Sequence, residues 1–156
     1  MNDGVLALAA LPNGDLVVGG DFTSAGGVPA NHVARWDGSS WSALGSGMNA
    51  RVFALATMPN GDVIAGGAFT TAGGQAATYL ARWNGSSWSS VGSGMNYEVY
   101  VLATLANGDL VAGGGFGTAG GVSASCIARW NGTAWSALGS GMNAFVTALA
   151  QRPNGD

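Results

Sequence analysis

Short apolar stretches separated by polar turns recur along the chain. In residues 48–94 the apolar runs are 51–58, 62–69, 79–84 and 88–92. Asn60-Gly61 and Asn84-Gly85 join two pairs of these runs, and Asn-Gly predicts a tight hairpin because both residues tolerate positive φ. The longer stretch 70–78 is rich in Gly and Ala and is expected to be a loop. The pattern therefore predicts four short antiparallel strands, and no helical period accompanies it.

This 47-residue unit is repeated along the chain. Two short motifs mark the period: Met-Asn at Met1, Met48, Met95 and Met142, and Pro-Asn-Gly-Asp or its Ala variant at Pro12, Pro59, Ala106 and Pro153. A constant period of this length indicates an architecture in which each unit buries its apolar faces against its neighbours.

The strands are apolar on both sides, which is typical of sheets covered on both faces. Four-stranded antiparallel sheets stacked around an axis have this property in a β-propeller. The predicted fold class is therefore an all-β propeller, here an incomplete arc of three blades plus one strand. The predicted blades are 1–47, 48–94 and 95–141, and 142–156 is expected to be the first strand and turn of a fourth blade.

Composition argues against some classes of function, nucleic-acid binding among them. Charged residues make up 8% of the chain, the net charge is −3, and all five basic residues are arginines. Three of these arginines belong to the repeat, so no basic patch remains and nucleic-acid binding is not expected. The apolar runs are shorter than the roughly 18 residues of a membrane span. Cys126 is the single cysteine and has no intrachain partner for a disulfide.

Each unit also carries a diglycine, an aromatic residue followed by Asp or Asn, and a second aromatic residue. In the second unit these are Gly66-Gly67, Trp83-Asn84 and Trp88. This arrangement resembles the kelch motif, with Trp where kelch has Tyr and with an added Asn-Gly-Asp turn. The whole unit is similar to the Gly-rich propeller repeats of bacterial surface or secreted proteins and of Rax2-like proteins. The resemblance implies a non-catalytic module for adhesion, protein contacts or scaffolding, located outside the cell or at its surface.

Residues that occur once in every unit are most simply structural. We expect the tryptophans to form the core between blades, and we expect one Asp–Arg pair within each blade, because the second and third strands are antiparallel. The structural set is Trp36, Trp41, Trp83, Trp88, Trp130, Trp135, Asp15, Asp62, Asp109, Arg35, Arg82 and Arg129. The alternative is that the tryptophans stack on sugars in pockets between blades, as in a propeller lectin.

No set of catalytic, cofactor-binding or metal-binding residues can be assembled from the sequence. The one histidine, His32, has Tyr79 and Cys126 at the same position in the next two units, so it is not a repeated ligand or nucleophile. One Asp per turn is a poor calcium site, because calcium takes six to eight oxygen ligands. We therefore expect a protein that is not an enzyme and needs no cofactor.

Positions that differ between units are expected on one face of the propeller, where the loops between units meet the loops between the second and third strands. Binding residues usually lie on loops held by a rigid scaffold. The candidate binding face comprises Arg51, Tyr97, Glu98, Phe145, His32, Tyr79, Gln75, Phe53 and Tyr100. The alternative is that these positions vary because nothing constrains them.

Three blades and one strand are too few to close a ring, because propellers have four to eight blades. The exposed flanks of such an arc predict a partner for each end. That partner is either further blades of the same polypeptide, with this chain a fragment of a larger extracellular repeat protein, or another copy of the chain. The ligand on the binding face, whether protein or glycan, is not identified by the sequence.

Overall fold

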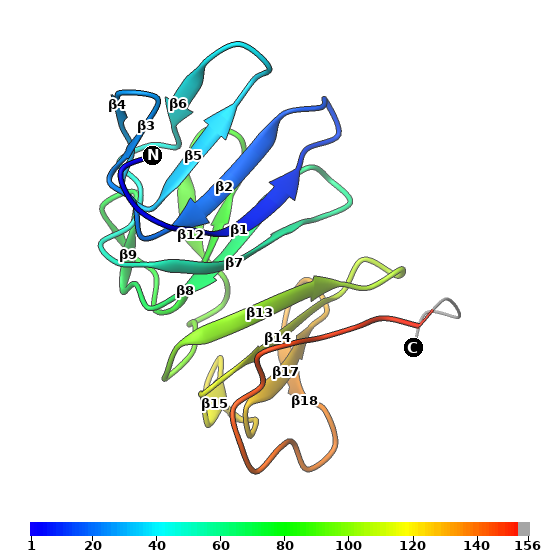
Figure 1. The fold of residues 1–156 in the computed structure, drawn as a ribbon. Helices are drawn as coiled ribbons and strands as arrows, with labels where there is room; N and C mark the ends of the chain where they lie inside the picture. Colours follow the sequence, from blue (N-terminus) through cyan, green and yellow to red (C-terminus); the bar gives the residue numbers. More distant parts are fainter. Residues whose placement is uncertain (153–156) are drawn as a thin grey trace.

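The computed structural model describes residues 1–152 and confirms the predicted fold class. Three four-stranded antiparallel sheets follow one another along the chain, and the described residues contain no helix. Figure 1 shows the sheets as successive blades of an incomplete arc, with blade 1 at the top and blade 3 at the bottom. No helix in the described part of the chain is long and apolar enough to cross a membrane.

Each blade has the strand order first, second, third, fourth, from the inside outwards. Blade 1 consists of β1 (Val5–Ala10), β2 (Leu16–Gly20), β5 (Val33–Trp36) and β6 (Trp41–Ala43). Blade 2 consists of β7 (Val52–Thr57), β8 (Val63–Gly67), β11 (Leu80–Trp83) and β12 (Trp88–Ser90). Blade 3 consists of β13 (Val99–Thr104), β14 (Leu110–Gly114), β17 (Ile127–Trp130) and β18 (Trp135–Ala137).

The loop between the second and third strands of each blade, expected over 70–78 in the second unit, contains a small two-stranded ribbon that the residue pattern did not predict. In blade 2 the ribbon pairs β9 (Thr71–Ala72) with β10 (Gln75–Ala76). Gly73 and Gly74 between them both have positive φ, at 59° and 77°, which is the conformation of a tight two-residue hairpin turn. The other ribbons are β3 (Ser24–Ala25) with β4 (Val28–Pro29) and β15 (Thr118–Ala119) with β16 (Val122–Ser123).

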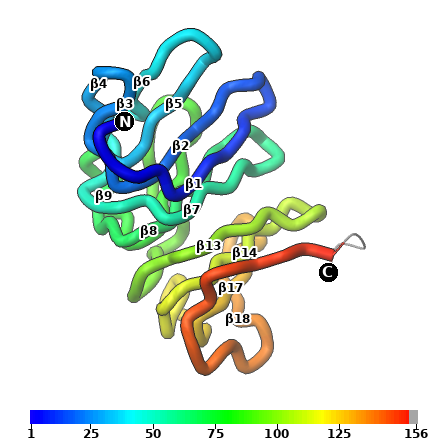
Figure 2. The backbone as a smooth tube through the Cα atoms, viewed as in Figure 1, coloured from blue at the N-terminus to red at the C-terminus, as the bar shows by residue number. Residues whose placement is uncertain are grey.

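The first strands β1, β7 and β13 lie side by side along the inner side of the arc (Figure 2). Small residues in the second strand permit this close approach. A Cβ placed on Gly66 of β8 would lie 2.6 Å from Cγ1 of Val99 in β13. Threonines also join neighbouring blades, because Thr104 Oγ1 donates to the carbonyl oxygen of Thr57 at 3.1 Å. The glycines therefore set the spacing of blades as well as their turns.

The segment 142–156, expected to be the first strand and turn of a fourth blade, has no strand assignment over its described residues. Val146 lies over Gly113 as Val52 lies over Gly19, and its backbone N–H donates to the Gly114 carbonyl oxygen at 3.1 Å. The segment runs along blade 3 without a strand assignment. A strand needs a continuous ladder of backbone hydrogen bonds, and no described segment pairs with 146–151 in that way. The fourth Pro-Asn-Gly-Asp turn, which begins at Pro153, lies outside the described residues.

The two ends of the blades differ in content. One end carries the Asn-Gly hairpin turns, and the other carries the ribbons and the junctions between units (Figure 1). Backbone hydrogen bonds hold each junction between units to the loop that follows the second strand of the preceding or same blade. The Ala68 N–H, for example, donates to the Arg51 carbonyl oxygen at 3.0 Å. The variable positions at this second end are therefore carried by backbone that hydrogen bonds hold in place.

Candidate functional site

The junction between units is clamped by an asparagine. The Asn49 Oδ1 atom accepts hydrogen bonds from the backbone N–H groups of Thr70 at 2.9 Å and Thr71 at 3.0 Å. Asn2 and Asn96 make the same pair of contacts in blades 1 and 3. The residues that follow these asparagines are the variable ones, so the repeat holds its most variable positions on an ordered support.

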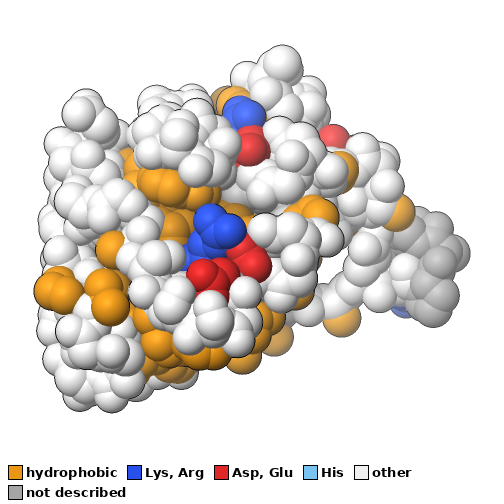
Figure 3. Space-filling view, turned by 90° about the horizontal axis from the view of Figure 1, so that it is seen from above, with side chains coloured by type: hydrophobic (Ala, Val, Ile, Leu, Met, Phe, Trp, Pro, Cys, Tyr) orange, Lys and Arg blue, Asp and Glu red, His pale blue; other side chains and the backbone are white. Residues whose placement is uncertain are grey.

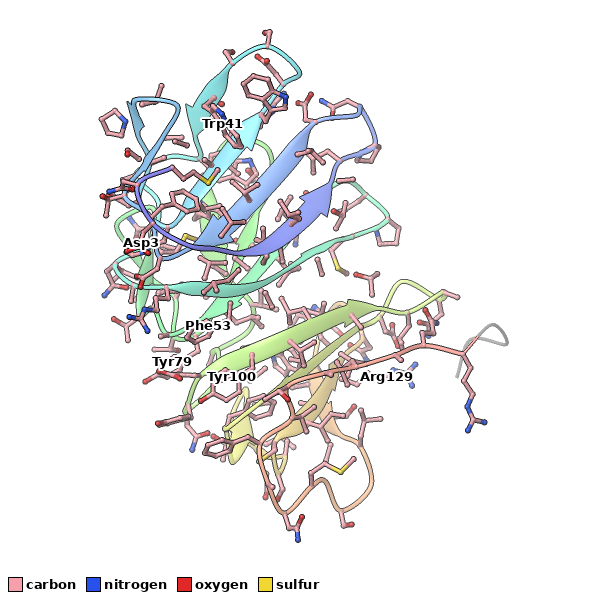
Figure 4. The ribbon with its side chains drawn as sticks, in the orientation of Figure 1. Asp3, Trp41, Phe53, Tyr79, Tyr100 and Arg129 are labelled. Carbon is pink, nitrogen blue, oxygen red and sulfur yellow. The ribbon has the colours of Figure 1, made fainter. Side chains whose placement is uncertain are left out.

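Three aromatic rings form a ladder across blades at this end of the molecule. The ring centroids of Phe53 in β7 and Tyr100 in β13 are 5.6 Å apart, and those of Tyr100 and Phe145 are 5.9 Å apart. Both pairs are tilted, as aromatic pairs prefer. Figure 4 shows Phe53 and Tyr100 close together at the end away from Arg129, which lies near the hairpin turns.

A second aromatic pair joins this ladder. The rings of Tyr79 and Tyr97 have centroids 6.3 Å apart. Tyr97 and Phe145 both pack over Gly115, where an added Cβ would lie 2.8 Å from Cδ1 of Tyr97 and 3.3 Å from Cε1 of Phe145. We call the resulting surface the aromatic face. It consists of Phe53, Tyr79, Tyr97, Tyr100 and Phe145, of which Tyr97 and Phe145 are exposed.

Polar groups border the aromatic face. The Tyr100 hydroxyl donates to Glu98 Oε2 at 2.9 Å. Burial of the ring, followed by this hydrogen bond and the charge of Glu98, raises the pKa of Tyr100 to about 12. Nε of Arg51 lies 2.7 Å from Oδ2 of Asp21, so an ion pair crosses from blade 2 to blade 1. Arg51 is therefore already paired, although its side chain stays exposed.

The structure brings together five of the nine predicted face residues, with Glu98 and Arg51 at their edge. No ring contact or side-chain hydrogen bond joins His32 or Gln75 to the aromatic face within the described residues. His32 has a positive φ of 64°, and its Nδ1 atom lies 3.2 Å from the Gly20 carbonyl oxygen. Gln75 is exposed on the ribbon of blade 2. These two residues lie in the loops at this end of the molecule but are not part of the aromatic face.

The residues at the repeat position of His32 in the other two blades also have positive φ. Tyr79 has a φ of 64° and Cys126 a φ of 62°, and these three are the positive-φ residues other than glycine in the described chain. Such a conformation is unfavourable for residues with a Cβ. Strained backbone of this kind gathers at functional sites. The residue types do not reveal this conformation, because the position holds neither Gly nor Asn.

The expected Asp–Arg pairs are present in all three blades. In blade 2, Arg82 Nε donates to Asp62 Oδ2 at 2.5 Å, and Nη2 also contacts that oxygen. Asn60 Nδ2 donates to the same carboxylate at 2.8 Å. Each pair thus anchors a hairpin turn to the third strand. The equivalent pairs are Asp15 with Arg35 and Asp109 with Arg129.

The burial of the tryptophans depends on their position in the blade. Trp88 and Trp135 are buried between blades, and each donates its indole N–H to a carbonyl oxygen of the preceding blade. Trp41, the equivalent residue of blade 1, is half-buried, because no described segment covers that flank. Trp36, Trp83 and Trp130 are also half-buried, each in a tilted ring contact with its partner in the pair. Trp88 and Trp135 are thus inaccessible as sugar-stacking surfaces.

Sequence reasoning missed a pocket of about 280 Å³ between blades 2 and 3. It lies at the end with the hairpin turns, opposite the aromatic face. Asp62, Arg82, Trp130, Met58 and Ser90 are among its lining residues. Most of the lining belongs to the repeated scaffold, so comparison of the units offered no signal that would single it out.

The stacked four-stranded blades and their repeated seams define a β-propeller. A family model described as the Rax2 C-terminal beta propeller domain matches residues 2–150, and the chain belongs to this family. No curated protein matches the chain. A crystal structure of a protein of unknown function from Dyadobacter fermentans is similar, with 18% identity and a TM-score of 0.44. That match covers 85% of this chain and 50% of the other, so the chain spans about half of that protein.

Proposed function

We propose that this β-propeller is a non-catalytic binding module and that a partner protein docks on the aromatic face. The observation that carries the proposal is the convergence of five aromatic side chains from positions that vary between units. Aromatic residues are enriched at protein interfaces and dominate their binding energy. An adhesive or scaffolding role outside the cell or at its surface, which the resemblance of the repeat to those of surface proteins implies, is part of this proposal.

The arrangement suits binding because its rings are already ordered. Phe53 and Tyr100 are half-buried, Tyr100 is in ring contact with Phe145, and the ring of Tyr97 packs against Gly115. Rings held in place before binding lose little conformational freedom in the complex, which favours affinity. The Arg51–Asp21 and Tyr100–Glu98 pairs then provide a polar border, as the rims of protein interfaces do.

Selection of binding peptides from a displayed library tests this proposal. Peptides selected on the wild-type chain should bind a Tyr97→Ala/Phe145→Ala variant at least about tenfold more weakly, a difference of about 1.4 kcal/mol. Val122→Ala is the matched control, because Val122 is an exposed apolar residue on the ribbon of blade 3 and lies outside the aromatic face. Equal binding to the double variant and the wild type would contradict a docking site on this face.

A carbohydrate-binding lectin is the second candidate, favoured by the pocket between blades 2 and 3. Asp62, Arg82 and the half-buried ring of Trp130 border that pocket, and sugars are bound by such combinations of polar groups and aromatic surfaces. A glycan array tests it directly. Ser90→Trp, which fills the pocket, should abolish any signal. Ala137→Trp, at the same repeat position in blade 3, should preserve it, and an array without signal contradicts the lectin hypothesis.

A further inference from the structure

Most charged side chains in the described residues are paired with an opposite charge. Each blade holds one Asp–Arg pair near its hairpin turns, and Arg51 of blade 2 is paired with Asp21 of blade 1. Figure 3, a view from above blade 1, shows few charged side chains, and the basic ones over this blade lie beside acidic ones. The acidic side chains that lack a basic partner therefore form a small group.

Three acidic residues have no ion pair within the described part of the chain: Asp3, Asp37 and Glu98. Asp37 accepts four hydrogen bonds from its own turn, and Asp3 is exposed and accepts one from the backbone. Glu98 is half-buried, and its Oε2 atom accepts from the Tyr100 hydroxyl. No described residue bonds to its Oε1 atom, and since no buried side-chain polar atom there lacks a partner, solvent reaches Oε1.

The repeat itself shows which group a carboxylate at this end accepts. Arg51 occupies the position of Glu98 in the preceding unit, and its Nε lies 2.7 Å from Oδ2 of Asp21. In the next unit Glu98 replaces the arginine, and Ala68 stands where the preceding blade has Asp21. Blade 3 thus presents a carboxylate where blade 2 presents a guanidinium, and no arginine of the described residues pairs with it.

Rings of the aromatic face lie next to this carboxylate. Tyr97 directly precedes Glu98, Tyr100 donates to it, and Phe145 is in ring contact with Tyr100. Tyr97 and Phe145 are 46% and 64% exposed. The face of an aromatic ring attracts a cation, so rings and carboxylate act in the same direction. This combination suits a positively charged group better than a neutral one.

The side chains at this end of the molecule carry a net negative charge. Among the described residues, three carboxylates lie here with one guanidinium: Asp3, Asp21 and Glu98 with Arg51. Figure 4 places Asp3 at the same end as Tyr100. The Asp–Arg pairs of the three blades lie near the hairpin turns at the opposite end, where their charges cancel. The resulting potential attracts a positively charged partner from solution.

We propose that the partner protein places an arginine on the aromatic face, with its guanidinium stacked on the rings of Tyr97 and Phe145 and donating to Glu98 Oε1. Arginine fits better than lysine, because its planar group stacks on rings and offers several donors to a carboxylate, whereas the lysine ammonium is a strongly hydrated point charge. This proposal rests on the docking of a partner on the aromatic face and names the side chain that the partner contributes.

Peptides selected on the wild-type chain from a displayed library are the probes. Their sequences should be enriched in arginine. Replacement of that arginine by citrulline, a neutral group of nearly the same shape, should weaken binding by about tenfold in calorimetric titration. Selected peptides without an arginine, or a citrulline peptide that binds as tightly as its parent, overturn the proposal.

Glu98→Gln tests the chain's side of the contact. It removes the charge and keeps an oxygen that can accept from Tyr100, so the fold should persist by circular dichroism. The arginine peptide should bind about tenfold more weakly, and the citrulline peptide should bind almost unchanged, because both replacements remove the same contact. Asp37→Asn is the matched control, since it removes a charge at the opposite end, where Asn84 and Asn131 make the same turn. Equal losses for Glu98→Gln and Asp37→Asn overturn the proposal.

Phe145→Leu tests the stacking, because it removes a ring and keeps an exposed apolar side chain. The arginine peptide should bind about two- to fivefold more weakly. Failure of this proposal differs from failure of the docking face. Peptides that bind Tyr97→Ala/Phe145→Ala weakly but tolerate both citrulline and Glu98→Gln overturn the arginine and keep the docking face. Peptides that bind the double variant as well as the wild type contradict the docking face and this proposal together.

Discussion

The carbonyl oxygen of Leu44 in blade 1 accepts a hydrogen bond from the indole Nε1 of Trp88 in blade 2, at 2.8 Å. Both residues are buried, so a polar group from each blade is satisfied inside the seam between them. Trp88 also makes a tilted ring contact with Trp83 of its own blade. One tryptophan per unit therefore supplies apolar area, ring packing and a directional bond that aligns neighbouring blades.

We expect Trp88→Phe to lower the free energy of unfolding by about 2 kcal/mol. About 1 kcal/mol comes from the lost hydrogen bond, and the rest from the volume lost in a buried seam. Urea denaturation monitored by circular dichroism measures this. Trp83→Phe is the matched control, because Trp83 is half-buried in the same ring pair and has no side-chain hydrogen bond within the described residues. Equal losses for the two variants would show that the bond to Leu44 contributes nothing.

The contact of Gly66 with Val99 predicts a coupled pair of substitutions. Gly66→Ala should destabilise the fold by about 1–3 kcal/mol, because its Cβ would overlap the valine side chain. In a Val99→Ala background the same substitution should cost about 1 kcal/mol less. Gly4→Ala should be nearly neutral, since nothing lies within 4 Å of its added Cβ and its φ is not positive. Additive effects of Gly66→Ala and Val99→Ala would rule out the predicted overlap.

The Asp–Arg pairs were predictable from the sequence because they depend on short-range register. Asp62 directly precedes the second strand of its blade and Arg82 lies near the end of the third, so antiparallel pairing brings them together. The propeller itself followed from the 47-residue period and from strands apolar on both sides. The ribbon of blade 2 could also have been found, because Gly73-Gly74 is a recognised hairpin turn.

The aromatic face was only partly predictable. Phe53 and Tyr100 share a repeat position, but Phe145 occupies the position of Arg51, so the period alone does not place it beside Tyr100. Its contact depends on the path of segment 143–152 along blade 3. The ion pair of Arg51 with Asp21 was hidden for a similar reason, because both residues stand at variable positions in different blades. Contacts between single variable residues cannot be derived from the repeat pattern and become visible only in the structure.

Ion pairs of different burial should respond differently to mutation. Arg82→Ala should cost about 1–2 kcal/mol, because it leaves the buried Asp62 carboxylate with only its turn contacts. Arg51→Ala should cost less than about 0.5 kcal/mol, since both partners of its pair are solvent-accessible. Denaturation at low and high salt checks both values. An Arg51 variant as destabilised as the Arg82 variant would contradict this ranking.

The raised pKa of Tyr100 predicts a loss of stability in alkali. Burial and Glu98 hold its pKa at about 12 in the folded chain, above the ordinary value of 10. The folded state therefore retains the proton more strongly than the unfolded state. The resulting stabilisation is present below pH 10 and is lost as the pH rises from 10 to 12. Urea denaturation over this range should show the decline in wild type and less of it in Tyr100→Phe.

Absorbance titration of the phenolate measures the pKa directly. The chain has three tyrosines, so a Tyr79→Phe/Tyr97→Phe variant leaves Tyr100 as the single titrating ring. Glu98→Gln in that background should lower its pKa towards 10, since it removes the nearby negative charge while burial remains. A midpoint near 10 in the folded parent variant would contradict the predicted environment.

The backbone at Cys126 predicts an unusual order of stabilities. Its φ of 62° is easily adopted by glycine and is costly for β-branched residues. Cys126→Gly should therefore raise the free energy of unfolding by about 0.5–1 kcal/mol, and Cys126→Val should lower it by about 1–2 kcal/mol. Ser125→Gly is the control, because Ser125 has no positive φ and glycine there should be destabilising. Chemical denaturation that ranked the valine variant above the glycine variant would mean that side-chain packing at this loop outweighs its backbone strain.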